Sequence, residues 1–469
     1  MRPGAAALLG LLSCGPPRQS GPLVLVVTLD TTRADALGAY ADVDAWGADL
    51  PAAQRPRPHT PRLDAWAAAG VRFQWALSHA PTTLSAHSSL WLGHDPHGHA
   101  VVRNGYPPLP TLPTLPAAFA AAGWDTVAVV GASVLAADQG LAAGFRVYDD
   151  TVTTRVRRRY EAPAEDVVRR ALAAVDARPD RAAPLLLWVH FFDPHSPWAR
   201  SPAAVGVAAP PYAGPLDGGS ESLDALIRET RDGAASTADR VQARALYLAE
   251  VAAVDAALAT LEDALAARGF GPDRLVVAVG DHGETLDELP ARPYGHGIDV
   301  EPVDLHVPLL VRGEGRFAVP AGRVVGTPVR LMDVPATVAA RVGLGSRFGA
   351  GQDLGPLWSD TPPVTWPGGF AEATKPDDRE RTDAWNNLPF ARAAWSGTAM
   401  RLHFPLLGVA PRTLALRVGT PALDDPAAAT ALDRALVDWD AAAPSHRPDP
   451  RTAETTEALR ALGYVDGGP

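Results

Sequence analysis

The chain has 469 residues and a net charge of −11; 47% of its residues are hydrophobic and 20% are charged. This is the composition of a soluble globular protein, long enough for one large domain with a smaller one or for three ordinary domains. The negative charge argues against a nucleic-acid partner, because binding to a phosphate backbone needs a basic surface.

Residues 1–14 have the parts of an export signal. Arg2 precedes an apolar run at 5–12, and Ser13 then leads to Cys14, the only cysteine of the chain. The Leu-Leu-Ser-Cys ending is similar to a bacterial lipobox, in which the cysteine is lipidated. We therefore expect an exported, periplasmic or cell-surface protein with a lipid anchor on Cys14. The alternatives are an ordinary secretory signal and a misassigned start. No later apolar run reaches the length of a membrane span, so we expect membrane contact only through this anchor.

Apolar strands and amphipathic helices alternate along the next part of the chain. The strands are predicted at 23–28, 71–77, 125–131, 184–192, 274–280 and 307–312. The helices are predicted at 61–69, 112–121, 164–177 and along a stretch that includes 246–265. This alternation indicates an α/β fold, in which a mainly parallel sheet has helices on both faces.

Two stretches break this pattern. Ser201 to Arg231 is rich in Pro, Gly, Ala and Ser without clear periodicity, which predicts a long surface loop that covers the site or selects the substrate. After Gly343 the pattern loosens, and we expect residues 349–366 to lead into a smaller C-terminal unit.

Acids and histidines gather at the predicted strand ends, where ligands bind in sheets of this kind. Asp30, Asp193 and Asp281 follow buried strands; His282 follows Asp281; Thr83 stands where a loop opens into a short helix; His195 and His296 lie in loops. Carboxylates and neutral imidazoles hold divalent metals at hydrolytic sites, and a helix N-terminus suits a phosphate or sulfate group. Taken singly, each residue has an ordinary structural alternative, such as a helix cap for Thr83. Their joint placement favours a metal site.

Several segments, taken in order, look like those of bacterial sulfatase-like proteins. They are residues 25–35, 60–64, 70–73, 81–93, 96–99, 103–105, 280–284, 306–309 and 332–337. The resemblance to the sulfatase/alkaline phosphatase superfamily implies a large mixed, mostly parallel sheet sandwiched by helices. It implies a catalytic domain over residues 22–345 and a smaller C-terminal subdomain over 346–469. The implied activity is metal-dependent hydrolysis or transfer of phosphate or sulfate esters.

The sequence departs from true sulfatases at the signature. Thr83 holds the position of the Cys or Ser that sulfatases oxidise to formylglycine, and His87 holds the position of the signature arginine. The lysines that help to bind sulfate are absent, because Lys375 is the only lysine of the chain. The pair Asp281-His282 replaces the Asp-Asn metal pair of calcium-dependent sulfatases. These departures resemble the branches with a threonine nucleophile, such as nucleotide pyrophosphatases and phosphoethanolamine transferases.

That resemblance implies a role for each candidate residue. Thr83 would attack the ester and form a covalent intermediate, with Thr82 as the minor alternative. Asp30, Thr83, Asp281 and His282 would hold one metal, zinc before manganese or calcium. His195 and His296, with Asp193, would hold a second metal or contact the substrate. Arg33, His87 and Asn104 would bind substrate oxygens or make structural hydrogen bonds.

Two other functions stay open at this point. One is a sulfatase that uses threonine directly, without formylglycine. The other is an inactive binding protein with the same fold, against which the intact Asp30, Asp281, His282 and His296 argue. The substrate is expected to be a small-molecule, glycan or lipid ester, whose alcohol the sequence does not identify.

Overall fold

A computed structural model describes residues 20–43, 50, 52–101, 103–152, 154–156, 159–289, 292–374, 391–404, 409–416 and 423–443. The predicted export signal at 1–14, with Cys14, lies outside these residues. None of the described helices is long and apolar enough to span a membrane.

A nine-stranded sheet forms the centre of the molecule. Its order is β10-β2-β9-β8-β1-β7-β3-β4, and β11 also pairs with β2. The strands are β1 (Leu23–Leu29), β2 (Val71–Leu77), β3 (Asp125–Val130), β4 (Val147–Asp149), β7 (Leu185–Phe191), β8 (Arg274–Gly280), β9 (His306–Gly313), β10 (Arg323–Val325) and β11 (Val329–Arg330). Only β9 runs antiparallel to its neighbours in this sheet, β2 and β8. The sheet is therefore mixed but mostly parallel, as predicted.

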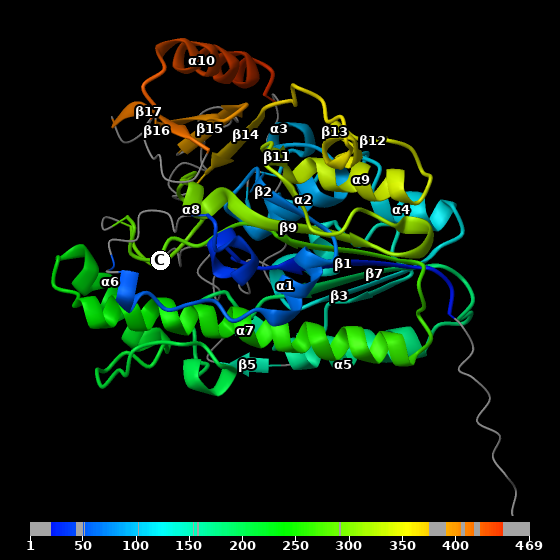
Figure 1. Cartoon of the computed structure of the whole chain (residues 1–469), viewed down its shortest axis with the longest axis horizontal. Helices are drawn as coiled ribbons and strands as arrows, with labels where there is room; N and C mark the ends of the chain where they lie inside the picture. Colours follow the sequence, from blue (N-terminus) through cyan, green and yellow to red (C-terminus); the bar gives the residue numbers. More distant parts are fainter. Residues whose placement is uncertain are drawn as a thin grey trace, which may run out of the picture.

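Helices cover both faces of this sheet (Figure 1). The described helices are α1 (Pro61–Ala68), α2 (Thr83–Leu92), α3 (Pro96–His99), α4 (Leu115–Ala121), α5 (Ala164–Asp176), α6 (Ser220–Arg231), α7 (Thr237–Ala267), α8 (Pro302–Leu305), α9 (Val334–Arg341) and α10 (Pro426–Ala441). Apolar residues of α1, α5 and α7 share one core, and those of α2, α4 and α9 share the other.

The central strand β1 explains why two cores form. Leu25 and Val27 belong to the core with α7, whereas Val24 and Val26 belong to the core with α2. Because side chains alternate across a strand, a continuous apolar run can bury both of its faces.

A four-stranded antiparallel sheet with α10 on it forms the C-terminal part, drawn in orange and red in Figure 1. Its strands are β14 (Gly369–Ala373), β15 (Ala391–Ser396), β16 (Ala399–Phe404) and β17 (Val409–Ala415). The ring of His97 in α3 stacks on Trp439 of α10, with 3.4 Å between ring centroids. The predicted fold class, including a smaller C-terminal subdomain, is thus confirmed. The boundaries at 345 and 346 stay predictions.

The described residues also form two small hairpins. They are β5 (Thr154–Val156) with β6 (Arg159–Glu161), and β12 (Arg347–Phe348) with β13 (Gly351–Gln352).

The expectation of one loop from Ser201 to Arg231 is wrong in its second half, because Ser220–Arg231 forms α6. Leu223, Leu226 and Thr230 recur at helical spacing and are buried. Only three such positions interrupt a polar stretch, so the periodicity is weak in the sequence.

Candidate active site

Asp30 and Asp281 meet at the carboxyl edge of the sheet. Strand β1 pairs with β8 so that Leu29 lies opposite Gly280, which places the two following acids side by side. The backbone N–H of Thr31 donates to Asp281 Oδ1 at 3.1 Å. Thr31 has a φ of 46°, a conformation that costs energy for a β-branched residue and is typical of functional sites.

Thr83 is the first residue of α2, and Thr82 is its N-cap. The Thr83 hydroxyl donates to Asp30 Oδ2 at 3.3 Å and lies 3.4 Å from His282 Nε2. The Thr82 hydroxyl is buried and has no hydrogen-bond partner among the described residues. Of the two threonines, the structure thus brings Thr83 to the acids.

The side-chain ligand atoms at this edge of the sheet suit a divalent cation. Ligand atoms of Asp30, Asp281 and His282 all lie within 4.8 Å of one another. His282 Nδ1 lies 2.9 Å from the Gly283 carbonyl, which can only accept, so Nδ1 carries the proton and Nε2 keeps its lone pair. Asp30 Oδ1 and Asp281 Oδ2 are buried, and neither has a hydrogen-bond partner among the residues that the structure describes. Such buried, unpaired oxygens are rare in proteins, and a cation held by these residues would satisfy them.

The electrostatics of Asp30, Asp281 and His282, called the triad below, also favour a cation. Burial, together with the charge of Asp281, raises the pKa of Asp30 well above its usual range. Burial likewise raises the pKa of Asp281, and burial with His296 nearby lowers the pKa of His282. Among the described residues, Asp30 pairs with His190, and Asp281 pairs with His87 and His282. A bound metal would hold both carboxyls ionised and the imidazole neutral.

Two further buried histidines flank the triad. His87, one turn after Thr83, places Nδ1 2.8 Å from the Thr83 carbonyl and 3.6 Å from Asp281 Oδ2. Burial lowers the pKa of His87 to about 3. The Nε2 atom of His190 lies 3.6 Å from Asp30 Oδ2. Sequence reasoning missed His190, although a histidine near the end of an otherwise apolar strand was a usable signal.

His195 and His296 lie beyond His282. The ring centroid of His296 is 4.6 Å from that of His282 and 5.0 Å from that of His195. His296 Nδ1 is 3.1 Å from a carboxylate oxygen of Glu284, which is fully buried and which sequence reasoning also missed. A carboxylate at Nδ1 fixes the ring orientation of a histidine and leaves Nε2 for a metal or substrate.

Asp193 has other partners. Its Oδ1 accepts hydrogen bonds from Arg200 at 2.8 Å and from the Ala164 backbone at 3.0 Å. It lines a cavity together with His195. Among the described residues, Asp30, Asp281 and His282 form the only group of three or more acids and histidines whose ligand atoms lie within 4.8 Å of one another, and this group does not include Asp193, His195 or His296.

Asn104 lies at the N-terminus of α2. Its Oδ1 accepts from the Leu84 backbone at 2.8 Å, a structural bond that caps the helix. Its Nδ2 is buried without a hydrogen-bond partner in the described part of the chain. That atom is the part of Asn104 that suits a substrate oxygen.

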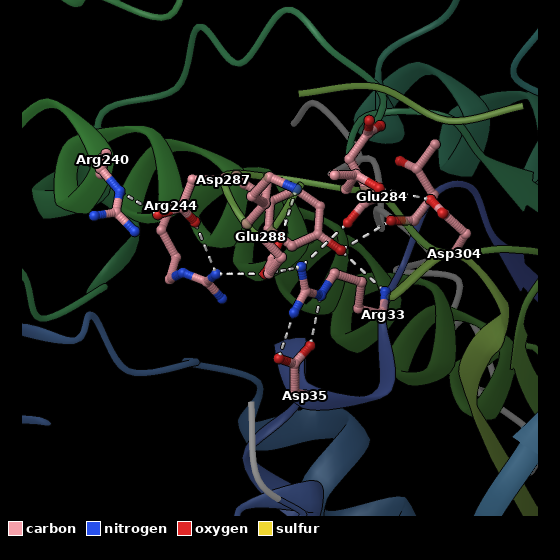
Figure 2. Close-up of polar contacts among 12 residues, drawn as sticks. Arg33, Asp35, Arg240, Arg244, Glu284, Asp287, Glu288 and Asp304 are labelled. Carbon is pink, nitrogen blue, oxygen red and sulfur yellow. Dashed lines mark hydrogen bonds and ion pairs between the residues drawn. The ribbon is translucent and has the colours of Figure 1, made fainter. Parts of the chain in front are cut away.

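Arg33, predicted to contact substrate, lies in a buried network of charges (Figure 2). Its guanidinium pairs with Asp35 at 2.7 Å and with Glu288 at 2.6 Å, and it donates to the Glu284 carbonyl. Arg244 extends the network from Glu288 to Asp287. These contacts support the segment that carries Glu284 and occupy much of the Arg33 side chain.

We expect Arg33→Met to destabilise the protein by about 3–5 kcal/mol, because it leaves Asp35 buried without its cation. Urea unfolding would measure this. The control is Arg316→Met, which removes an exposed pair with Asp273 and should change the stability far less, because solvent screens such a pair. If Arg33→Met instead has near-native stability and a raised KM, the result would indicate that Arg33 binds the substrate.

The fold and the triad together define an α/β protein with a candidate metal site at the carboxyl edge of its sheet. A model of the sulfatase family matches residues 22–344. The chain therefore belongs to the sulfatase family and is an ester hydrolase of the sulfatase/alkaline phosphatase superfamily. No curated protein matches it in sequence.

Solved structures agree on the fold. A phosphonate monoester hydrolase of Agrobacterium radiobacter has a TM-score of 0.63 and 20% identity, covering 90% of this chain and 95% of that one. A sulfatase candidate from Bacteroides thetaiotaomicron VPI-5482 has a TM-score of 0.66 and 18% identity, and the match covers 96% of this chain and 95% of that one. A structure bound to its substrate D-glucosamine-2-N,6-O-disulfate has a TM-score of 0.65 and 15% identity, covering 95% and 99%.

Proposed function

We propose that this protein cleaves phosphate esters in preference to sulfate esters, through a covalent ester on Thr83. The observation that carries the proposal is the Thr83 hydroxyl, 3.3 Å from Asp30 Oδ2 and 3.4 Å from His282 Nε2. Hydrolysis is the default outcome, and transfer to a second alcohol is the variant of the same chemistry.

Asp30, Asp281, His282 and Thr83 would hold a divalent cation, with zinc preferred over manganese or calcium because the donors mix nitrogen and oxygen. When bound, the cation supplies positive charge that favours ionisation of the threonine hydroxyl and stabilises charge developing on the ester. His195 and His296 would contact the substrate or hold a second metal.

The residues of the chain supply orientation and nucleophile. Asp30 accepts the hydrogen bond of Thr83 and so directs its Oγ1. Oγ1 loses its proton to solvent and forms a bond to phosphorus, while the bond from phosphorus to the alcohol oxygen breaks and the alcohol leaves with a proton taken from solvent. A water then attacks phosphorus, which releases phosphate and restores the Thr83 hydroxyl. The N-terminus of α2 favours negative charge beside Thr83, and Asn104 Nδ2 can donate to an ester oxygen.

Two observations favour phosphate over sulfate. Threonine stands at the signature position, where it cannot become formylglycine, and the chain has a single lysine, Lys375. Because the chain belongs to the sulfatase family, the second candidate function is hydrolysis of sulfate esters with Thr83 itself as the nucleophile. Both candidates make Thr83 the nucleophile and differ only in the central atom.

A substrate panel separates the two candidates. Nitrophenyl phosphate, bis(nitrophenyl) phosphate and nitrophenyl sulfate share a leaving group, so differences in their kcat/KM values do not come from the leaving group. We expect one of the phosphate substrates to exceed the sulfate by at least about 10-fold, which corresponds to about 1.4 kcal/mol in the barrier. Faster turnover of the sulfate would reverse the preference.

The location of the protein is a further part of the proposal. If Cys14 carries a lipid, the protein expressed in bacteria should partition into the detergent phase, and Cys14→Ala should move it to the aqueous phase. Cys14→Ser serves as a second variant of similar size. Partition that neither variant changes would contradict the anchor.

A further inference from the structure

The turn that follows β1 carries Asp30 into the candidate active site. Its next residue, Thr31, has a φ of 46°, in the left-handed region that costs free energy for a β-branched side chain. Such a conformation persists only where the surrounding contacts hold it. The backbone contacts of Thr31 therefore show what keeps this turn in shape.

The long helix α7 supplies one of these contacts through Tyr247. Its phenol ring is buried, with 1% of the residue exposed. The hydroxyl donates to the Thr31 carbonyl at 2.8 Å and accepts from the backbone N–H of Arg33 at 3.0 Å. A carbonyl can only accept and an N–H can only donate, so the direction of both bonds is fixed. A single hydroxyl thus bridges two peptide groups of the turn.

The other backbone contact of Thr31 leads to the triad. Its N–H donates to Asp281 Oδ1 at 3.1 Å, while the preceding residue, Asp30, donates its own N–H to the Phe191 carbonyl at 3.0 Å and so stays attached to the sheet. The two peptide groups that flank the Cα of Thr31 therefore have separate partners, Asp281 for one and Tyr247 for the other. Because the angle between these groups depends on φ, a turn that relaxed to a negative φ could not keep both bonds in this geometry.

The hydroxyl of Tyr247 matters for this turn more than its ring does. Helix α7 buries apolar residues before and after this position, such as Leu246, Leu248 and Val251, and a phenylalanine would fill the same space. A buried hydroxyl is favourable only when it is hydrogen-bonded. In the described part of the chain, both of its hydrogen bonds go to the turn that leads from Asp30.

We propose that Tyr247 is a positioning residue for the candidate metal site. Its hydroxyl holds Thr31 in the strained conformation, which keeps the Thr31 N–H on Asp281 and keeps Asp30 beside it in place for the cation. This role rests on the proposed function, because Asp30 and Asp281 must be the metal ligands. The support that Tyr247 gives to the turn itself does not depend on the metal.

Tyr247→Phe is the direct test, since it removes the hydroxyl and keeps the ring. The dissociation constant of zinc is measured by competition with a chromophoric chelator, so the readout needs no turnover. It should rise by about 10–100-fold, as when a group that orients a metal ligand is lost. An unchanged dissociation constant would overturn the proposal.

Tyr40→Phe is the matched control. Tyr40 is fully buried, and its hydroxyl likewise donates to a carbonyl, that of Phe73, and accepts from an N–H, that of Leu309, both at 2.9 Å. These bonds join β2 to β9, and in the described residues none of them involves the triad. Both variants should lose similar stability, but only Tyr247→Phe should weaken zinc binding. An equal loss of zinc affinity in both would indicate a general loosening of the fold and contradict the positioning role.

Thr31→Gly tests whether the hydroxyl acts by holding the strained turn. Glycine adopts a positive φ at no steric cost, so a turn with glycine should need Tyr247 less. In the Thr31→Gly background, Tyr247→Phe should therefore raise the zinc dissociation constant by a smaller factor than in the wild type. An equal rise in both backgrounds would mean that the hydroxyl acts by another route, against the proposal.

Amide hydrogen exchange of the metal-free protein separates the support of the turn from the presence of a metal. Tyr247→Phe should speed exchange at Thr31 and Arg33 by about 10-fold or more, whereas Tyr40→Phe should do so at Leu309. Faster exchange at Thr31 and Arg33 in a protein that binds no zinc would refute the proposed metal site and keep the support of the turn. Zinc binding that does not depend on Tyr247, with unchanged exchange at both amides, would refute the positioning role and keep the metal site.

Discussion

Thr83→Ala is expected to lower kcat for phosphate ester hydrolysis by at least about 10³-fold, because it removes the attacking oxygen. The substitution keeps the carboxylates and the imidazole of the triad, so the metal content should change little. A residual rate is expected, since a correctly placed water can attack slowly in the same environment. The measurement is kcat with nitrophenyl phosphate, together with metal analysis of each purified variant.

Thr82→Ala is the matched control for Thr83→Ala. Both hydroxyls are buried and adjacent, yet only that of Thr83 has a hydrogen bond to Asp30. Thr82→Ala should therefore keep most of its activity. The reverse pattern, with activity lost only in Thr82→Ala, would shift the nucleophile by one residue. Full activity in both variants would show that neither threonine is the nucleophile.

Asp281→Asn should have opposite effects on activity and on the stability of the metal-free protein. The substitution removes a charged ligand, so bound metal and kcat should both fall, the latter by about 10³-fold or more. In the metal-free protein the same change removes a buried negative charge beside Asp30. At neutral pH, metal-free Asp281→Asn should therefore have a higher unfolding midpoint than the metal-free wild type.

The pH dependence of stability follows from the raised pKa values of Asp30 and Asp281. A carboxyl whose pKa is raised on folding stabilises the protein when protonated, which holds below its unfolded pKa of about 4. This stabilisation is lost as the pH rises through the folded pKa. The metal-free wild type should thus lose stability from about pH 4 upward, and Asp281→Asn should lose less.

Thermal unfolding with a chelator between pH 5 and 8 would measure both effects. Asp224→Asn, at an exposed position of α6, controls for the change in net charge. Adding metal should raise the midpoint of the wild type well above that of Asp281→Asn. A metal-free wild type that is as stable at pH 8 as at pH 5 would contradict the account.

Much of the fold was predictable because its signals are local. Buried strands such as β1 and β8 have continuous apolar runs that end at an acid, and parallel strands place those ends at one edge. The sequence therefore predicted that Asp30 and Asp281 lie together. The antiparallel direction of β9 was harder to predict, because an apolar run does not indicate in which direction the strand runs.

The environment of single side chains was harder to predict. Arg33 follows the same strand as Asp30, but its pairing with Glu288 depends on a segment 255 residues away. Glu284 and His190 were missed for a similar reason, because their roles come from contacts with His296 and Asp30. The helix at 220–231 was missed because few of its residues face the core.

The most direct test of the central claim is to trap the ester on Thr83. The protein is mixed with nitrophenyl phosphate, quenched in acid within milliseconds, digested and analysed by mass spectrometry. We predict a phosphoryl group on Thr83, formed in a burst together with nitrophenol and absent from Thr83→Ala. Nitrophenol release without any phosphorylated threonine, and without a burst, would contradict the covalent mechanism and leave water as the attacking group.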